Sequence, residues 1–264
     1  MKQKEIFHPF KEIAGNMQAG LALICDHASS DLPVEYGSLG LDPAEFKRHI
    51  AYDIGAQLLT EELAKRLEAP AVISHFSRLL IDPNRGEHDP TLIMQLSDGS
   101  VIPHNYPLNE AERKRRIDNY YTPYDKAIGR LIANVGEASG NSPFVVSVHS
   151  FTPVWRGKAR PWHIGLLWDS DRRVFDPLFE GLNKIGHIKV GDNEPYDGAL
   201  KGDTMYRHCT KKGIAHILIE VRQDLIAGEE GVREWANYLE PLFRKINEMR
   251  EIHMKQLHPS RADN

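Results

Sequence analysis

Short apolar runs recur along the chain and are separated by longer stretches of mixed polarity. The runs are rich in Val, Ile and Leu and do not alternate strictly with polar residues, which is typical of strands covered on both faces. They occupy residues 21–27, 70–76, 144–150, 162–169 and 215–221. We therefore expect five buried strands in one central sheet.

The stretches between these runs carry apolar residues at helical spacing. Residues 42–69 open with an Asp-Pro pair, which favours a helix start, and are expected to form one long helix. Residues 109–135 form a second, which Pro123 must break or kink because proline lacks a backbone N–H. Further helices are expected at residues 171–185 and 233–256.

Strands that alternate with helices predict an α/β fold. We expect three layers, in which a mixed, mainly parallel central sheet carries helices on both faces. No repeat or linker divides the 264 residues, so we expect one domain. Its ends, about residues 1–15 and 257–264, are expected to be flexible.

Charge and composition exclude several functional classes. The formal charge of -4 argues against nucleic-acid binding, which needs a concentrated basic surface. The basic run Arg113–Arg116 is flanked by acidic residues and is expected on a solvated helix face. No apolar run approaches the roughly 18 residues of a membrane span. With no signal peptide and no C-x-x-C pair among Cys25 and Cys209, we expect a soluble cytoplasmic protein without nucleic-acid or membrane partners.

Polar groups of the ionisable or metal-binding kind lie at the ends of the apolar runs. His27 closes the first run, His149 closes the third, and Glu220 lies near the end of the last. The segment 82–85, Asp-Pro-Asn-Arg, follows a further apolar stretch. Because the carboxyl ends of parallel strands meet at one edge of a sheet, these groups are expected to lie together.

The pattern favours a hydrolytic metal site. Catalytic zinc takes three protein ligands and leaves one position open. His27 and His149 supply two imidazoles, and the residues leave three candidates for a carboxylate ligand, Asp53, Asp26 and Asp82. Such an ion makes water acidic enough to ionise near neutral pH. A nearby carboxylate must then move the proton to the leaving nitrogen, and Glu220 suits that role.

The segment 82–85 also indicates a binding site for a carboxylate. The planar fork of Arg85 matches a carboxylate with two parallel hydrogen bonds, and Asn84 adds a neutral donor beside it. Asp82 could accept the second N–H of a ligating histidine and fix its orientation. The same residues also favour a turn. A turn can at the same time bind a carboxylate, so the two interpretations are compatible.

The ordered set of these motifs resembles zinc-dependent carboxypeptidases and related acyl-amino-acid hydrolases, and most closely the N-formylglutamate amidohydrolases. The stretches that carry the resemblance are CDHASSDLP, HIAYDIGA, SRLLIDPNR, VVSVHSFTP, GDNEPYDG and ILIEVRQD. They extend from about residue 20 to about residue 226. The resemblance implies a fold of the zinc-exopeptidase (phosphorylase/hydrolase-like) kind.

The resemblance also implies roles for individual residues. His27 and His149 would bind Zn²⁺ or another divalent metal, and Glu220 would be the general base. Arg78 would polarise the scissile carbonyl or hold a second carboxylate. The residues expected near the substrate are Asn84, Arg85, Asn193, Tyr196 and Arg222.

Two positions depart from these families. The carboxypeptidase pattern has a Glu three residues after the first His, where this chain has Ser30. We therefore expect Asp53 to be the third metal ligand. Asp26 stands where the formylglutamate enzymes tend to carry an apolar residue or proline. We expect Asp26 and Asp82 to lie behind the ligating histidines.

The implied activity is hydrolysis of the amide bond of a small N-acyl, or N-formyl, acidic amino acid in amino-acid catabolism. One alternative is a zinc carboxypeptidase or a peptidoglycan-type amidase. Another is a non-catalytic protein that binds a small molecule or a metal on the same fold.

We expect tryptophans in the core or in pocket walls, namely Trp155, Trp162 and Trp168. The histidines expected to have no role in the site are His75, His163, His187, His208 and His216.

Overall fold

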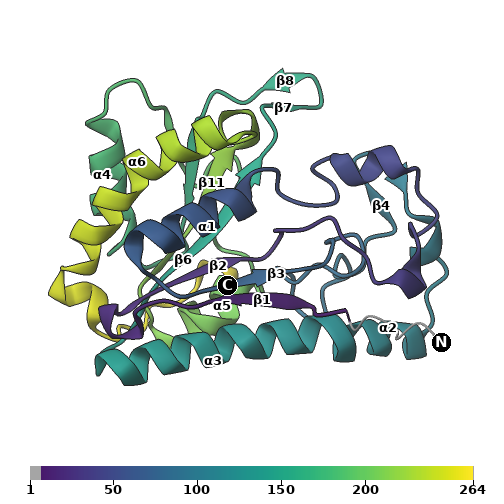
Figure 1. The fold of residues 1–264 in the computed structure, drawn as a ribbon, viewed down its shortest axis with the longest axis horizontal. Helices are drawn as coiled ribbons and strands as arrows, with labels where there is room; N and C mark the ends of the chain where they lie inside the picture. Colours follow the sequence, from purple (N-terminus) through teal and green to yellow (C-terminus); the bar gives the residue numbers. More distant parts are fainter. Residues whose placement is uncertain (1–6, 264) are drawn as a thin grey trace.

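A seven-stranded sheet lies between two layers of helices in the computed structural model, which describes residues 7–263 (Figure 1). The strand order is β1-β3-β2-β6-β11-β9-β10. The four strands β3, β2, β6 and β11 are parallel, whereas β1 and β9 run antiparallel to β3 and β11. The mixed, mainly parallel sheet is therefore confirmed. The strands are β1 (Phe10–Ile13), β2 (Leu21–Cys25), β3 (Ala71–Ser74), β6 (Phe144–Phe151), β9 (Ile164–Leu167), β10 (Val190–Asp192) and β11 (His216–Arg222).

The five predicted strands correspond to β2, β3, β6, β9 and β11. The edge strands β1 and β10 were not predicted because they are short and only partly buried. β1 lies inside the N-terminal segment expected to be flexible, and pairs Phe10 with Ser74. In the C-terminal segment, which was also expected to be flexible, Arg261 forms an ion pair with Asp197. Two hairpins lie outside the sheet, namely β4 (Leu96–Ser97) with β5 (Ser100–Val101) and β7 (Val154–Trp155) with β8 (Lys158–Ala159).

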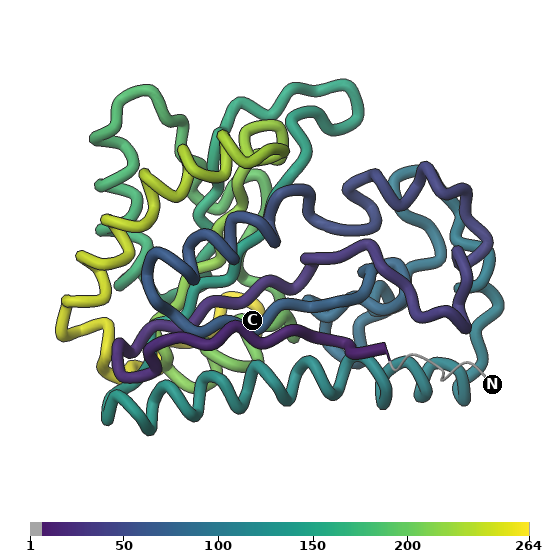
Figure 2. The backbone as a smooth tube through the Cα atoms, viewed as in Figure 1, coloured from purple at the N-terminus to yellow at the C-terminus, as the bar shows by residue number. Residues whose placement is uncertain are grey.

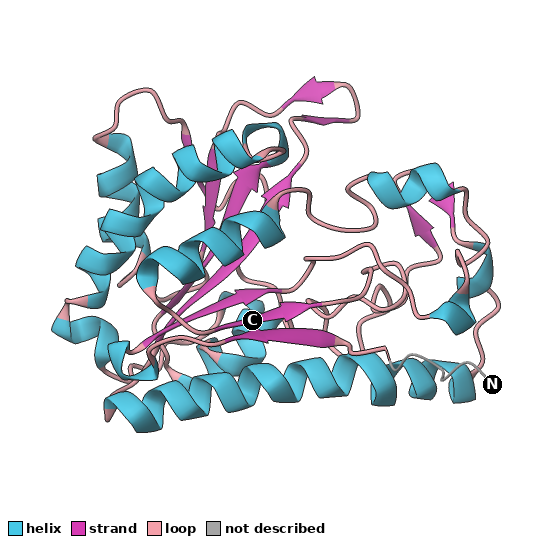
Figure 3. Ribbon diagram, viewed as in Figure 1, coloured by secondary structure: helices cyan, strands magenta, loops and turns pink. Residues whose placement is uncertain are grey.

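Helices cover both faces of the sheet, as predicted (Figures 2 and 3). Each layer encloses its own apolar core against the sheet, because the strands present apolar side chains in both directions. One layer contains α1 (Ala56–Leu67), α4 (Phe175–Asn183) and α6 (Glu229–Asn247). The other contains α2 (Glu110–Arg116), α3 (Thr122–Ser139) and α5 (Thr204–His208). Among the described residues, no helix has the length and apolar character needed to cross a lipid bilayer.

The prediction of one helix over residues 42–69 is wrong. A short 3-10 helix, Pro43–Lys47, is followed by an irregular segment, and α1 begins only at Ala56. Gly55 has a φ of 83°, and a Cβ there would lie 2.2 Å from the carbonyl oxygen of Ile226. The backbone N–H of Asp53 also donates to the carbonyl of His27 over 2.8 Å. Contacts with distant segments therefore hold Asp53 on a loop across the strand ends.

The helical backbone is not interrupted near Pro123, but it changes its winding there. A π-helical turn, Ile117–Tyr121, separates α2 from α3 and ends just before the proline. Because proline cannot donate to the carbonyl four residues earlier, the wider turn absorbs the missing hydrogen bond. The helices expected at residues 171–185 and 233–256 are present, with shifted ends, as α4 and α6.

The basic run Arg113–Arg116 is only partly solvated, which corrects the expectation for its last residue. Arg116 is 1% exposed. Its guanidinium donates to the carbonyls of Leu80 and His104 and to Oδ1 of Asn105. It thereby ties α2 to the segments that follow β3 and β5.

Replacing Arg116 with Met should lower the free energy of unfolding by about 2 to 4 kcal/mol, because buried carbonyls would lose their donor. The matched control is Arg115→Met, since Arg115 is half exposed and also pairs with Glu112. This control should cost no more than about 0.5 kcal/mol. Urea denaturation of both variants measures the difference, and equal costs would contradict the role given to Arg116.

Candidate active site

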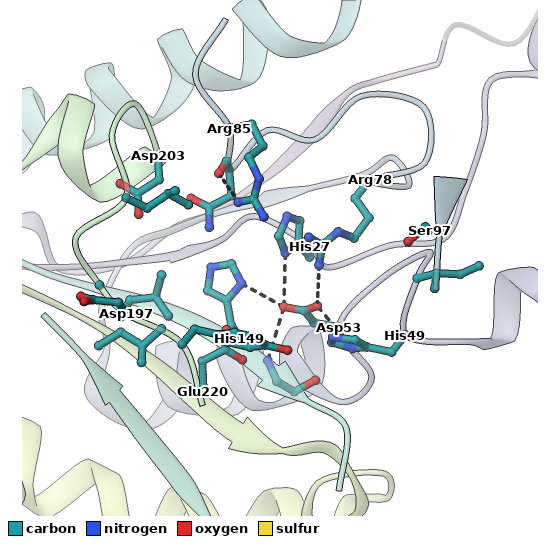
Figure 4. A pocket seen from close by; sticks show the side chains of 18 of the residues that line it. His27, His49, Asp53, Arg78, Arg85, Ser97, His149, Asp197, Asp203 and Glu220 are labelled. Carbon is teal, nitrogen blue, oxygen red and sulfur yellow. Dashed lines mark hydrogen bonds and ion pairs between the residues drawn. The ribbon is translucent and has the colours of Figure 1, made fainter. Parts of the chain in front are cut away.

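Polar side chains from several strand ends meet at one edge of the sheet (Figure 4). His27 follows the end of β2, and Arg78 and Asp82 follow β3. His149 and Glu220 are direct partners in the parallel register of β6 and β11. Because these strands are parallel, their carboxyl ends face the same way and bring the residues together.

Three buried residues, His27, Asp53 and His149, form a group that could hold a metal ion. One potential ligand atom of each lies within 4.8 Å of the other two. Oδ2 of Asp53 lies 3.3 Å from Nδ1 of His27 and 2.9 Å from Nδ1 of His149. All three side chains are almost completely buried.

The other ring nitrogen of each histidine faces a second carboxylate. Nε2 of His27 lies 2.7 Å from Oδ1 of Asp82, and Nε2 of His149 lies 3.3 Å from Oδ2 of Asp26. A proton on each Nε2 satisfies these contacts and turns both Nδ1 lone pairs toward Asp53. Two lone pairs and a carboxylate oxygen repel one another unless a cation or protons lie between them. The donor set therefore fits a divalent metal, for which imidazole and carboxylate are common ligands.

Asp26 is held by a dense hydrogen-bond network. It accepts hydrogen bonds from Tyr124 Oη at 3.0 Å and Thr204 Oγ1 at 2.9 Å, and a weaker one from Ser147 Oγ at 3.3 Å. Burial alone would raise the pKa of Asp26, but the bond from His149 and the nearby imidazoles outweigh it and lower the pKa. Asp26 therefore stays ionised and can orient the His149 ring.

Arg78 and Glu220 flank the group on the cavity side. The guanidinium of Arg78 lies 2.9 Å from Oδ2 of Asp82 and 3.4 Å from Oδ1 of Asp53, so two carboxylates already neutralise it. Burial raises the pKa of Glu220 to about 7, and its Oε2 has no hydrogen-bond partner among the described residues. A buried carboxyl oxygen without a partner is suited to hydrogen-bonding a ligand or water.

A cavity of about 380 Å³ opens over these residues. Asn84 and Arg85 line it, and Oδ1 of Asn84 accepts a hydrogen bond from the backbone N–H of Thr204. The predicted site residues that line the cavity are His27, Asp53, Arg78, Asn84, Arg85, His149, Tyr196 and Glu220. The volume lies within the range of small-molecule binding sites.

Two predicted substrate-binding residues lie outside the cavity lining. Oδ1 of Asn193 accepts hydrogen bonds from the backbone N–H groups of Trp168 and Gly198, so Asn193 shapes the loop that carries Tyr196. Arg222 forms an ion pair of 2.8 Å with Asp224. Trp155 does line the cavity, as a wall residue.

The sequence reading missed His49 and Asp203, which also line the cavity. Nδ1 of His49 lies 3.6 Å from Oδ1 of Asp53, and burial lowers the pKa of His49 to about 4. His49 lies four residues before Asp53 in the sequence. Because this is also a helical spacing, it was taken as part of the predicted helix and did not mark His49 as a site residue. Asp203 caps the N-terminus of α5, and burial raises its pKa to about 7. No local pattern marks its burial.

Comparison with known proteins decides the family. A family model described as N-formylglutamate amidohydrolase matches residues 19–227. The chain belongs to the N-formylglutamate amidohydrolase family. It is thus an amidohydrolase by family, in agreement with the resemblance found in the sequence.

Solved structures share the fold of this chain. A gene product of Agrobacterium tumefaciens is 34% identical, with a TM-score of 0.83 over 90% of this chain and 94% of that one. An N-formylglutamate amidohydrolase from Ralstonia eutropha JMP134 has the same fold at 21% identity, with a TM-score of 0.71 over 91% of this chain and 97% of that one. No curated protein matches the chain.

Replacing Asp203 with Asn should change how stability depends on pH. The folded pKa, about 7, lies above the ordinary 3.8, so the folded protein holds this proton more tightly than the unfolded chain. The ionisation of Asp203 should therefore lower the free energy of unfolding of the wild-type protein by roughly 1 to 4 kcal/mol as pH rises from 4 to 7. Asn keeps the cap but cannot ionise, so the variant should gain Tm relative to wild type over that range.

Thermal unfolding between pH 4 and 8 measures this difference. Asp42→Asn is the matched control, because Asp42 also caps a helical turn but faces solvent. A difference between Asp203→Asn and wild type that is constant with pH would contradict the assigned pKa.

Proposed function

We propose that this amidohydrolase removes the N-formyl group of an acidic amino acid, with one divalent metal ion held by His27, Asp53 and His149. The observation that supports this most directly is the buried donor set, which opens into the same cavity as Glu220 and Arg85. The family supports the amide bond as the target. The cavity volume, about 380 Å³, supports a small substrate.

The ion would supply Lewis-acid chemistry, which draws electrons from an acyl carbonyl and makes water more acidic. The chain supplies the orientation of the ligands. Asp82 and Asp26 fix the two imidazoles through their Nε2 atoms, and Arg78 fixes Asp53 through Oδ1. Buried ligands held from behind keep their geometry without reorganisation.

Glu220 is the proposed proton carrier. It lies beside His149 in the sheet register, and its Oε2 has no partner among residues 7–263. In our proposal it takes the proton of the attacking water and delivers it to the amide nitrogen, so that the amino acid leaves as a neutral amine. Arg78 then faces the negative charge that develops on the carbonyl oxygen.

Asn84 and Arg85 are proposed to bind the α-carboxylate of the amino acid. Both line the cavity, and Arg85 forms no ion pair with a protein carboxylate within the described part of the chain. Its guanidinium is therefore available for a substrate carboxylate, which it can bind with two parallel hydrogen bonds. This contact would fix the formyl group relative to Glu220.

Replacing Glu220 with Gln should lower kcat on N-formylglutamate by about 10²- to 10⁴-fold, because Gln cannot accept the proton. Metal content and Tm should stay close to wild type, since Gln has nearly the same shape. Glu229→Gln is a control, as Glu229 is exposed on α6 and does not line the cavity. Wild-type kcat in metal-loaded Glu220→Gln would disprove the proposed mechanism.

Removing the metal with a chelator should abolish formate release and lower Tm, because Asp53 would again face two imidazoles without a cation between them. Adding Zn²⁺ should restore both. His149→Ala should bind less metal, measured by elemental analysis. Full activity of a protein shown to be free of metal would contradict the assigned site.

A further inference from the structure

We propose that Arg160 binds the side-chain carboxylate of the substrate and thereby selects acidic amino acids. This inference rests on the proposed function, because it extends the substrate contacts of that same cavity. Sequence reasoning gave Arg160 no role. The resemblance offered Arg78 as one possible holder of a second carboxylate.

Arg160 follows the β7–β8 hairpin and lies beside the cavity, against aromatic rings of which two line it, although Arg160 is not itself a lining residue. Its guanidinium carbon lies 5.0 Å from the ring centroid of Tyr196, 5.4 Å from that of Trp155 and 5.7 Å from that of Phe151. Tyr196 and Trp155 both line the cavity. Rings on the faces of a guanidinium restrict its motion and leave its N–H edge as the binding edge.

The hairpin anchors one nitrogen of this guanidinium. Nη1 of Arg160 donates to Oγ1 of Thr152 over 3.0 Å and contacts the Thr152 carbonyl at 3.4 Å. The Nε–Nη2 edge is not used by these bonds. An anchored guanidinium is well prepared to bind a carboxylate, because little side-chain entropy remains to be lost.

The charges around the cavity also favour Arg160 over Arg78. Arg78 is already paired with Asp53 and Asp82. Within residues 7–263, by contrast, Arg160 forms no ion pair with a carboxylate. A partly buried cation without a counter-ion binds an anionic group more strongly than one that protein carboxylates have neutralised.

The acidic residues near the cavity mouth do not compete for Arg160. Asp98 pairs with Arg48 over 2.8 Å, and Asp197 pairs with Arg261 over 2.7 Å. Within residues 7–263, Arg85 and Arg160 are then two cations at or beside the cavity that form no ion pair with a protein carboxylate. Two such cations match a ligand with two carboxylates, one at the α-carbon and one at the side chain.

The test compares N-formylglutamate with N-formylglutamine, which has a neutral side chain of nearly the same shape. Arg160→Gln should lower kcat/KM for N-formylglutamate by about 10- to 100-fold, as expected for losing a charge-assisted contact. The value for N-formylglutamine should be unchanged. The loss should appear mainly in KM, because the contact is present before the transition state.

Two control variants separate charge from structure. Arg156→Gln removes a cation on the same hairpin that also stacks on Trp155, at 5.6 Å, and should leave the preference unchanged. Thr152→Val removes the hydroxyl that holds Nη1 but keeps the charge of Arg160. If Thr152→Val or Arg156→Gln reproduces the loss of Arg160→Gln, hairpin structure or general charge explains the effect, and the inference is wrong.

Binding without turnover distinguishes this inference from the proposed function. Calorimetry of the metal-loaded protein should show that Arg160→Gln weakens glutarate by about 10- to 100-fold and leaves its half-amide glutaramate unchanged. If the wild type turns over neither formyl substrate but shows this binding pattern, the proposed function fails and the carboxylate site stands. If glutarate and glutaramate lose affinity equally, or neither does, Arg160 is not the selective contact.

Discussion

The site depends on one electrostatic constraint, the convergence of two imidazole Nδ1 atoms on a single oxygen of Asp53. Carboxylates behind both rings, Asp82 and Asp26, hold this arrangement. With a proton on each Nε2, both Nδ1 lone pairs point at Asp53. In the proposed function a cation between these groups would relieve their repulsion, and the surrounding hydrogen bonds hold the three side chains in place.

The fold supplies this constraint through its parallel strands. β2, β6 and β11 end at the same edge, so His27, His149 and Glu220 arrive side by side from distant parts of the sequence. Apolar cores on both sheet faces hold the strands in register. The loops beyond the strand ends then carry the charged groups that face the cavity, where shape and charge can vary without disturbing the sheet.

Charge pairing divides the cavity arginines into two kinds. Arg78 is bound by two carboxylates and acts within a fixed network, whereas Arg85 and Arg160 have no protein carboxylate partner among the described residues. The charge of Arg78 is shared with Asp53 and Asp82, whereas the charges of Arg85 and Arg160 are not paired within the described residues. The sequence shows only that arginines are present. Their pairing follows from side chains that meet across loops far apart in the chain.

The sequence by itself determined the α/β fold, the five central strands and the set of polar residues at their ends, because hydrophobic periodicity is a local property. It also marked His27, His149 and Glu220, since a polar residue that ends an apolar run stands out without knowledge of its neighbours. Departure from the carboxypeptidase pattern led us to expect Asp53 as the third ligand, but only the tertiary structure shows that Asp53, and not Asp26 or Asp82, lies between the imidazoles. That outcome depends on the loop at residues 48–55, where contacts from Ile226 and His27 override local helical spacing.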